Sequence, residues 1–326
     1  MKIVSDIDIP FIVEAVRRGW LDVEICPMKS EEITSSAIRD ADVLVVRTRT
    51  LINESLLSGS RVKLVCTATI GFDHIDTAYC ESHHIRWMSC PGCNAQAVCD
   101  YIEEALNEYQ IFRSSNFHLS SSPLTIGVVG VGHVGSLVAQ MAERRGMRVL
   151  LNDPPKDLGV SLDFIAKNCD VITFHTPLAK TGPFPSYHLC DEAFLSRCKQ
   201  GALIINAARG GIADERALLH SGHPYILDTW ENEPHITSAV LDKALLASMH
   251  IAGYSVQGKR NASQMCLNAI AAYFNLPKID LSEYSYATVS TKKGDSAPGW
   301  LSRISDSLKK NPTAFESLRK AYPLRG

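Results

Sequence analysis

The sequence predicts an α/β protein with two doubly wound parallel-sheet domains, a cleft between them, and a small C-terminal α+β unit. Two observations support this prediction. Short runs rich in Val, Ile and Leu alternate with helical patterns twice along the chain, and parallel strands need such crossover helices. The length of 326 residues also exceeds what one hydrophobic core usually supports.

The first domain is predicted over residues 1–93 and is completed by the later segment 257–276. Its five expected strands are the β-rich runs KIVSD, DVEICP, ADVLVVRT, VKLVCTAT and IRWMSC. A helix is expected near residues 11–18, between the first two of these strands. Residues 94–112 open on Asn94, a favourable N-cap, and are rich in helix formers. This helix is expected to carry the chain into the second domain.

The second domain is predicted over residues 94–256. Its expected strands are TIGVVG, MRVLLND, DVITFHTP, ALIINAA, YILDTW and a last short one at MHIAG. Nearly continuous apolar runs of this kind are typical of strands that are buried on both faces. A helix over 257–274 then returns the chain to the first domain. Residues 277–326 differ in character and are expected to form a third unit that ends in two short amphipathic helices.

Composition and charge exclude several classes of function. The chain has 33 Lys and Arg against 35 Asp and Glu. It therefore lacks the net positive charge that would attract the protein to nucleic acids or anionic membranes. No apolar run approaches the ~18 residues of a membrane span, and the start MKIVSDIDIP carries charges where a signal peptide is apolar. A cytoplasmic protein with reduced thiols and without a bound metal is therefore expected.

A glycine-rich loop predicts a dinucleotide site. In GVVGVGHVG, Gly130, Gly132 and Gly135 follow an apolar strand and precede the expected helix SLVAQMAERRG, the spacing of a Rossmann-like fold. His133 is expected at the exposed tip of this loop. Asp153 ends the next strand, where a carboxylate accepts hydrogen bonds from a ribose 2′-hydroxyl and repels a 2′-phosphate. NAD is therefore favoured over NADP.

Polar side chains that follow the later strands predict acid–base chemistry on a 2-hydroxy acid. Arg209 comes just after one buried strand and offers a planar fork for a carboxylate. His250 follows another strand and suits proton transfer near neutral pH. The run LDTWENEP places Asp228 at a strand end and supplies a carboxylate to support the imidazole. The spacing alone does not choose between Glu231 and Glu233.

These motifs together resemble a known family. The segments GVGHVG, HTPL, INAARGGIAD, LDTWENEP and HIAGY follow one another in the order found in D-2-hydroxyacid dehydrogenases. The segments TATIGFDHID, PGCNAQAV, HTPLAKTGPFPSYHL and FESLRKAYPLR resemble a branch of that family whose substrate is a small phosphorylated hydroxy acid. The resemblance implies that Glu233 is the catalytic acid, Arg209 the substrate clamp and His250 the acid/base.

The resemblance also implies binding residues and an assembly. It implies a homodimer, although the C-terminal segment is shorter than is usual in the family. Substrate contacts are implied for Thr48, Thr69 and Tyr254. The substrate phosphate needs further cations, for which the candidates are Arg47, Arg49, Lys259, Arg260, Arg319 and Lys320. The NAD site is expected to involve Gly130, Gly132, His133, Val134, Gly135, Asp153, Thr176, Ala207, Ala208, Asp228 and Gly253.

Two other functions remain open at this level. One is a sister dehydrogenase, such as one that acts on 3-phosphoglycerate. The other is an NAD-sensing interaction protein that shares the fold and whose turnover is incidental.

Overall fold

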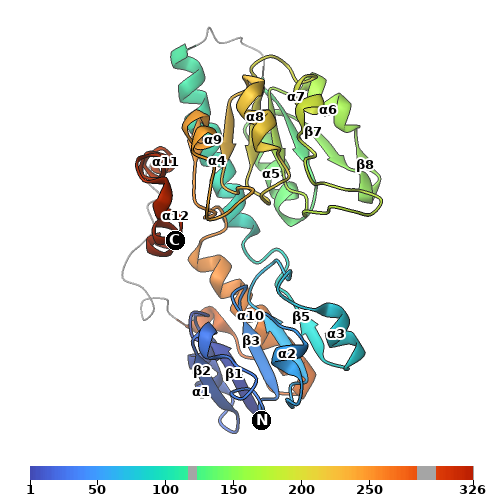
Figure 1. The fold of residues 1–326 in the computed structure, drawn as a ribbon, viewed down its shortest axis with the longest axis vertical. Helices are drawn as coiled ribbons and strands as arrows, with labels where there is room; N and C mark the ends of the chain where they lie inside the picture. Colours follow the sequence, from blue (N-terminus) through green and yellow to red (C-terminus); the bar gives the residue numbers. More distant parts are fainter. Residues whose placement is uncertain (117–122, 285–298, 326) are drawn as a thin grey trace. The chain divides into compact units, whose positions relative to one another are not determined.

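The computed structural model describes residues 1–116, 123–284 and 299–325, and these fall into two compact units (Figure 1). Unit 1 contains residues 1–94 and the described residues from 255 to 284. Unit 2 contains the described residues from 95 to 254 and from 299 to 325. Each unit has its own sheet. The predicted α/β class with two mainly parallel sheets is confirmed.

Unit 1 is a five-stranded parallel sheet in the order β2-β1-β3-β4-β5. Its strands are β1 (Lys2–Asp6), β2 (Glu24–Met28), β3 (Val43–Val46), β4 (Leu64–Thr67) and β5 (Arg86–Met88). Alternate strand residues pack on opposite faces of the sheet. One face is covered by α1 (Ile12–Gly19) and α10 (Val256–Phe274), and the other by α2 (Glu54–Leu57) and α3 (Thr77–Ser82). Helix α10, orange in Figure 1, thus completes a domain built mostly from the start of the chain.

Unit 2 is a seven-stranded sheet in the order β12-β11-β10-β9-β6-β7-β8. Its strands are β6 (Thr125–Val129), β7 (Arg148–Asp153), β8 (Leu158–Gly159), β9 (Val171–Phe174), β10 (Leu203–Asn206), β11 (Tyr225–Leu227) and β12 (Leu246–Ala247). Its helices are α4 (Ala95–Asn116), α5 (His133–Arg144), α6 (Leu162–Asn168), α7 (Glu192–Leu195), α8 (Glu215–Ser221), α9 (Ser238–Lys243), α11 (Trp300–Lys310) and α12 (Phe315–Ala321). The two-residue β8 is antiparallel and was not predicted.

Both sheets reverse their strand order at an internal point. In unit 2 the order turns back between β6 and β9, and in unit 1 between β1 and β3. In open α/β sheets, ligands bind outside the carboxyl ends of the strands at such a point. The loops after these four strands are therefore the places where each unit is built to bind a ligand.

Two details differ from the sequence analysis. The last strand was predicted at MHIAG, but β12 ends at Ala247. The backbone turns there because the N–H groups of Ile251 and Ala252 donate to the Asp228 carboxylate instead of to a neighbouring strand. The described residues beyond 277 also do not form a separate unit. Those up to 284 pack with unit 1, and those from 299 onward pack with unit 2.

Within the described residues, every helix is too short or too polar to cross a membrane.

Candidate active site

The predicted glycine loop lies at the switch point of unit 2. Gly130 follows β6 with φ of 88°, and a Cβ there would lie 2.8 Å from the backbone of Thr176 after β9. Gly135 packs closely in the same way, because its Cβ would meet the carbonyl oxygen of Gly130. At Gly132 a Cβ would meet nothing within 4 Å. The loop is thus tight on its inner side and open at the glycine that a pyrophosphate would approach.

Helix α5 begins at His133, three residues earlier than predicted, so His133 is the first residue of the helix and not the tip of a loop. The helix has 12 residues, and its first N–H groups have no intrahelical partner. His133 is exposed and Val134 is partly buried. A helix N-terminus in this position favours a bound phosphate because its N–H groups and its dipole both face the anion.

Asp153 ends β7 beside the glycine loop, as predicted. Its Oδ2 accepts a hydrogen bond of 2.9 Å from the N–H of Val131 and lies 3.6 Å from Nζ of Lys156. The carboxylate is therefore held against the loop, which leaves Oδ1 for a further donor. That arrangement suits the hydroxyl groups of an NAD ribose.

Thr176 provides an independent sign of a ligand. Its Oγ1 is buried and has no hydrogen-bond partner among the described residues. Buried hydroxyl groups in folded proteins nearly always have a partner. Because Thr176 follows β9 beside Gly130, a bound dinucleotide would satisfy it. The residues present thus fit NAD, with Ala207 and Ala208 after β10 and Gly253 after β12 also in unit 2.

The carboxyl ends of β10 and β11 bring Arg209 towards the LDTWENEP segment. Asn206 fixes the turn after β10, because its side chain accepts from the N–H of Ala208 and donates to the carbonyl of Arg209. A Cβ on Gly210 would overlap the carbonyl oxygen of Trp230, so only glycine permits this approach. Arg209 is partly buried at the edge where these strands end.

His250 and Glu233 form a hydrogen-bonded pair. Nδ1 of His250 lies 2.8 Å from Oε2 of Glu233, and the other carboxylate oxygen accepts from the N–H of Trp230 at 2.9 Å. Although burial opposes ionisation, the hydrogen bond and charge of His250 bring the pKa of Glu233 below its usual value. His250 itself has φ of 57°, a backbone conformation that is rare outside glycine and concentrates at functional sites.

The structure separates the two glutamates that spacing could not distinguish. Oε1 of Glu231 lies 3.0 Å from Nε2 of His188 and also accepts from the N–H of Glu215. Glu231 therefore connects two loops of unit 2, whereas Glu233 pairs with His250.

Asp228 binds the backbone of the loop that follows His250, at Ile251 and Ala252. It is 1% exposed, and its oxygens accept from the hydroxyl of Ser248 and from the N–H groups of Ile251 and Ala252. The family resemblance implies a role for Asp228 in the NAD site. Its observed partners show that the side chain fixes the backbone after His250.

Arg325 also binds the backbone of residues 251–254, and the sequence analysis did not identify it. Its Nη2 donates to the carbonyl oxygens of Ala97, Ile251 and Ala252, and its Nε donates to that of Tyr254. Burial is the main influence on its guanidinium and lowers the pKa of Arg325. The motif FESLRKAYPLR contained this residue, but only the folded chain shows what it contacts.

Tyr254 and Arg319 lie together in unit 2. Nε of Arg319 donates to the Tyr254 hydroxyl at 3.1 Å, and the guanidinium lies 5.8 Å from the centre of the tyrosine ring. The charge of Arg319 also contributes to the lowered pKa of Glu233. The tail segment thus supplies a cation near the predicted acid–base pair.

Thr48 and Thr69 belong to unit 1 and follow β3 and β4. Thr48 is exposed and Thr69 is partly buried. The Thr69 hydroxyl donates to the carbonyl oxygen of Gly71 at 2.9 Å. Both residues lie at the carboxyl edge of their sheet, where ligands of such sheets bind.

Two of the predicted phosphate candidates lie together in unit 1. Arg47 follows β3 and pairs with Asp8, which follows β1, at 3.3 Å. Lys259 in α10 is partly buried, and burial together with the charge of Arg47 lowers its pKa to about 8. By contrast, Nη1 of Arg260 donates to the carbonyl of Leu281 at 2.7 Å. Arg47 and Lys259 are thus two cations at the switch point of unit 1.

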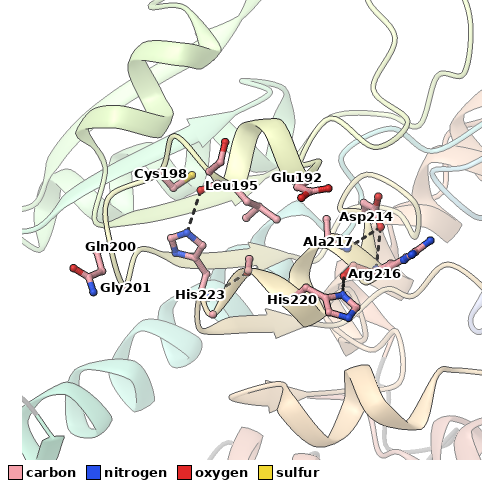
Figure 2. Close-up of a pocket in the computed structure, with 13 residues that line it drawn as sticks. Glu192, Leu195, Cys198, Gln200, Gly201, Asp214, Arg216, Ala217, His220 and His223 are labelled. Carbon is pink, nitrogen blue, oxygen red and sulfur yellow. Dashed lines mark hydrogen bonds between the residues drawn. The ribbon is translucent and has the colours of Figure 1, made fainter.

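A cavity of about 910 Å³ lies elsewhere in unit 2, along α7 and α8 (Figure 2). It reaches Gly201 and His223, which precede β10 and β11. Figure 2 shows His223 bonded to the Leu195 carbonyl and His220 bonded to the Arg216 carbonyl. Its lining, as far as the structure describes it, includes none of the predicted site residues. The acid–base pair therefore belongs to a different surface.

Comparison with known proteins places the chain in one family. Residues 99–264 match the family model "D-isomer specific 2-hydroxyacid dehydrogenase, NAD binding domain". An erythronate-4-phosphate dehydrogenase of Bacteroides fragilis is 42% identical over 100% of this chain and 97% of its own.

Two solved structures are similar in fold. A D-lactate dehydrogenase of Aquifex aeolicus, complexed with NAD and lactic acid, is 25% identical with a TM-score of 0.65 over 84% of this chain and 96% of its own. An NAD+-bound 3-phosphoglycerate dehydrogenase of Entamoeba histolytica is 26% identical with a TM-score of 0.67, over 84% and 95%.

Proposed function

The chain belongs to the D-isomer specific 2-hydroxyacid dehydrogenases and, among them, to the erythronate-4-phosphate dehydrogenase family. On this premise, we propose that the protein oxidises 4-phospho-D-erythronate to 2-oxo-3-hydroxy-4-phosphobutanoate. The observation that carries the proposal is the 2.8 Å pair of His250 and Glu233 on the same sheet edge as Arg209. On the strength of the family resemblance, we assign this reaction to pyridoxal 5′-phosphate biosynthesis.

NAD is the cofactor of this activity, and it supplies the acceptor for the hydride from C2 of the substrate. The loop from Gly130 to Gly135 and the N-terminus of α5 would hold its pyrophosphate. Asp153 would bind the ribose hydroxyls, and the buried hydroxyl of Thr176 would gain a partner. Asp228 would act on this site through the loop that it fixes.

His250 removes the proton from the 2-hydroxyl group as C2 is oxidised. Nδ1 bonds to Glu233, so Nε2 is the nitrogen that faces the proton transfer. The imidazole becomes positively charged when it takes the proton, and the Glu233 carboxylate stabilises that charge. The lowered pKa of Glu233 keeps the carboxylate ionised at neutral pH.

Arg209 binds the substrate carboxylate. A guanidinium can donate two parallel hydrogen bonds to a carboxylate, which orients C2 as well as neutralising the charge. Tyr254, Thr48 and Thr69 are further substrate contacts, as the resemblance implies.

Arg47 and Lys259 bind the substrate phosphate. They lie at the switch point of unit 1, and their mutual repulsion is part of the reason that the pKa of Lys259 is low. A phosphate dianion between two cations would remove that repulsion and favour the charged lysine. In unit 2, Arg319 beside Tyr254 is a further candidate cation for the substrate.

Steady-state kinetics with NAD and four acids test the proposal. We expect 4-phosphoerythronate to give a kcat/KM at least tenfold above erythronate, 3-phosphoglycerate and D-lactate. A preference for 3-phosphoglycerate would instead favour a sister dehydrogenase. If NAD binds and none of the acids is oxidised, the chain is an NAD-sensing protein of the same fold and the proposed function is wrong. A homodimer and a cytoplasmic location stay predictions.

A further inference from the structure

A chain of hydrogen bonds inside unit 1 ends at Thr69. Nε2 of His74 lies 3.0 Å from Oγ1 of Thr67, which lies 2.6 Å from Oγ1 of Thr69. The Thr69 oxygen lies 2.9 Å from the carbonyl oxygen of Gly71. His74 and Thr67 are buried, at 7% and 0% exposed, whereas Thr69 is only partly buried. The Thr69 end of this series of hydrogen bonds is therefore accessible to a ligand.

The direction of each hydrogen bond follows from the number of protons. A carbonyl oxygen can only accept, so the Thr69 hydroxyl donates to Gly71. A hydroxyl has one proton, so Thr67 must be the donor in its bond to Thr69. Thr67 has then no proton left for His74. Nε2 of His74 must therefore carry the hydrogen and donate to Thr67.

The surroundings of His74 agree with this neutral tautomer. Its Nδ1 is buried and has no hydrogen-bond partner among the described residues. A charged imidazolium would place an unpaired N–H at Nδ1 inside the protein, which is costly. Burial also lowers the pKa of His74.

We propose that His74 is a positioning residue that fixes Thr69 as a hydrogen-bond acceptor towards the substrate. The inference rests on the proposed substrate role of Thr69. The proton of Thr69 is held by Gly71 and one lone pair is taken by Thr67, so one lone pair remains. Thr69 can then accept from a substrate hydroxyl but cannot donate to a carboxylate or phosphate oxygen.

The group selected is the 3-hydroxyl of a 2,3-dihydroxy acid. The 2-hydroxyl gives up its proton during the reaction and cannot remain a donor through it. Thr69 thus distinguishes a 2,3-dihydroxy acid from an otherwise identical acid without the 3-hydroxyl.

Nitrogen-15 NMR of the full chain, labelled at histidine, tests the tautomer directly. The His74 signals are assigned by their loss in His74→Gln. We expect the Nε2–H tautomer, with no titration across the range in which exposed histidines change charge, about pH 5 to 8. An Nδ1–H tautomer or a charged ring would overturn the proposal.

Kinetics then test the consequence for specificity. His74→Gln keeps an N–H near the position of Nε2, whereas His74→Leu removes the donor. The ratio of kcat/KM for 4-phosphoerythronate over its 3-deoxy analogue should be unchanged in His74→Gln. In His74→Leu it should fall by roughly threefold to tenfold, the worth of one hydrogen bond.

The outcomes separate the two proposals. If His74→Leu weakens both substrates equally, or if both variants keep the parent's ratio, His74 does not act through Thr69. If the parent oxidises no 2-hydroxy acid, the proposed function fails, and the NMR result still decides the tautomer. Should His74→Leu not fold, the NMR measurement on the parent still decides the proposal, because an Nδ1–H tautomer or a charged ring overturns it.

Discussion

Replacing Lys259 with Met tests whether the phosphate subsite makes the fold less stable. Burial and the charge of Arg47 lower the pKa of this lysine from 10.5 to about 8. At ~1.4 kcal/mol per pH unit, that difference means that charging Lys259 destabilises the folded state by about 3 kcal/mol. Methionine has a similar length without the charge. Lys259→Met should therefore raise the free energy of unfolding at pH 7 by up to about 3 kcal/mol.

The gain should vary with pH in one direction. Because the folded pKa of about 8 lies below the unfolded value of 10.5, the unfolded parent binds more protons between these two pH values. The stability of the parent therefore rises through that window. The difference between Lys259→Met and the parent should be largest below pH 8 and should vanish above pH 10.5. Urea denaturation at pH 7 and pH 10 measures the change, and most of the difference should already be lost at pH 10.

The same change should weaken the binding of the phosphorylated substrate. We expect the KM for 4-phosphoerythronate to rise at least tenfold in Lys259→Met, while the KM for erythronate changes little. In the parent, the KM for the phosphorylated acid should rise above about pH 8, as Lys259 loses its proton. Lys278→Met, at an exposed lysine of unit 1, is the control and should alter neither property. A destabilised Lys259→Met, or equal KM changes for both acids, would refute the reasoning.

Three further predictions concern unit 2. Glu233→Gln should lower kcat on the order of 10²-fold with little change in KM, because the charged His250 loses its carboxylate; a change in KM alone would contradict the assigned role. Asp153→Ser should raise the NADP over NAD ratio of kcat/KM roughly tenfold, since removing the carboxylate ends its repulsion of a 2′-phosphate, and an unchanged ratio would argue against Asp153. Arg325→Met should lower the free energy of unfolding by about 3 kcal/mol or more in denaturation experiments, because each buried carbonyl left without a donor costs ~1–3 kcal/mol; unchanged stability would show that these contacts are weak.

Local patterns were enough to predict the two sheets and the dinucleotide loop. Buried strands appear as apolar runs whatever lies beside them, so β1, β6 and β10 lie inside the predicted runs. The glycine spacing and Asp153 belong to one strand–helix–strand unit, and short-range geometry decides their positions. The start of helix α5 was less well predicted, because the helix begins at His133, three residues before the expected start at Ser136.

Other features depend on contacts between distant parts of the chain. Nothing in WENEP distinguishes Glu231 from Glu233, because the choice is made by where His188 and His250 lie in the fold. The strand predicted at MHIAG is lost because Asp228, more than 20 residues earlier, binds the backbone N–H groups there. Arg325 is 71 residues from Tyr254 and reaches it only after folding.

The charges and hydroxyls of the two units support a division of tasks. In unit 2, His250 is fixed through Glu233 and through a loop held between Asp228 and Arg325, all within buried or partly buried surroundings. Fixed surroundings of this kind favour a chemical step, because the proton acceptor needs no rearrangement during the reaction. In unit 1, the polar groups described at the sheet edge, among them Arg47, Thr69 and Lys259, offer hydrogen bonds and charge. Substitutions of His250 or Glu233 should therefore act mainly on kcat, whereas those of Arg47, Thr69 or Lys259 should act mainly on KM and on the choice of substrate.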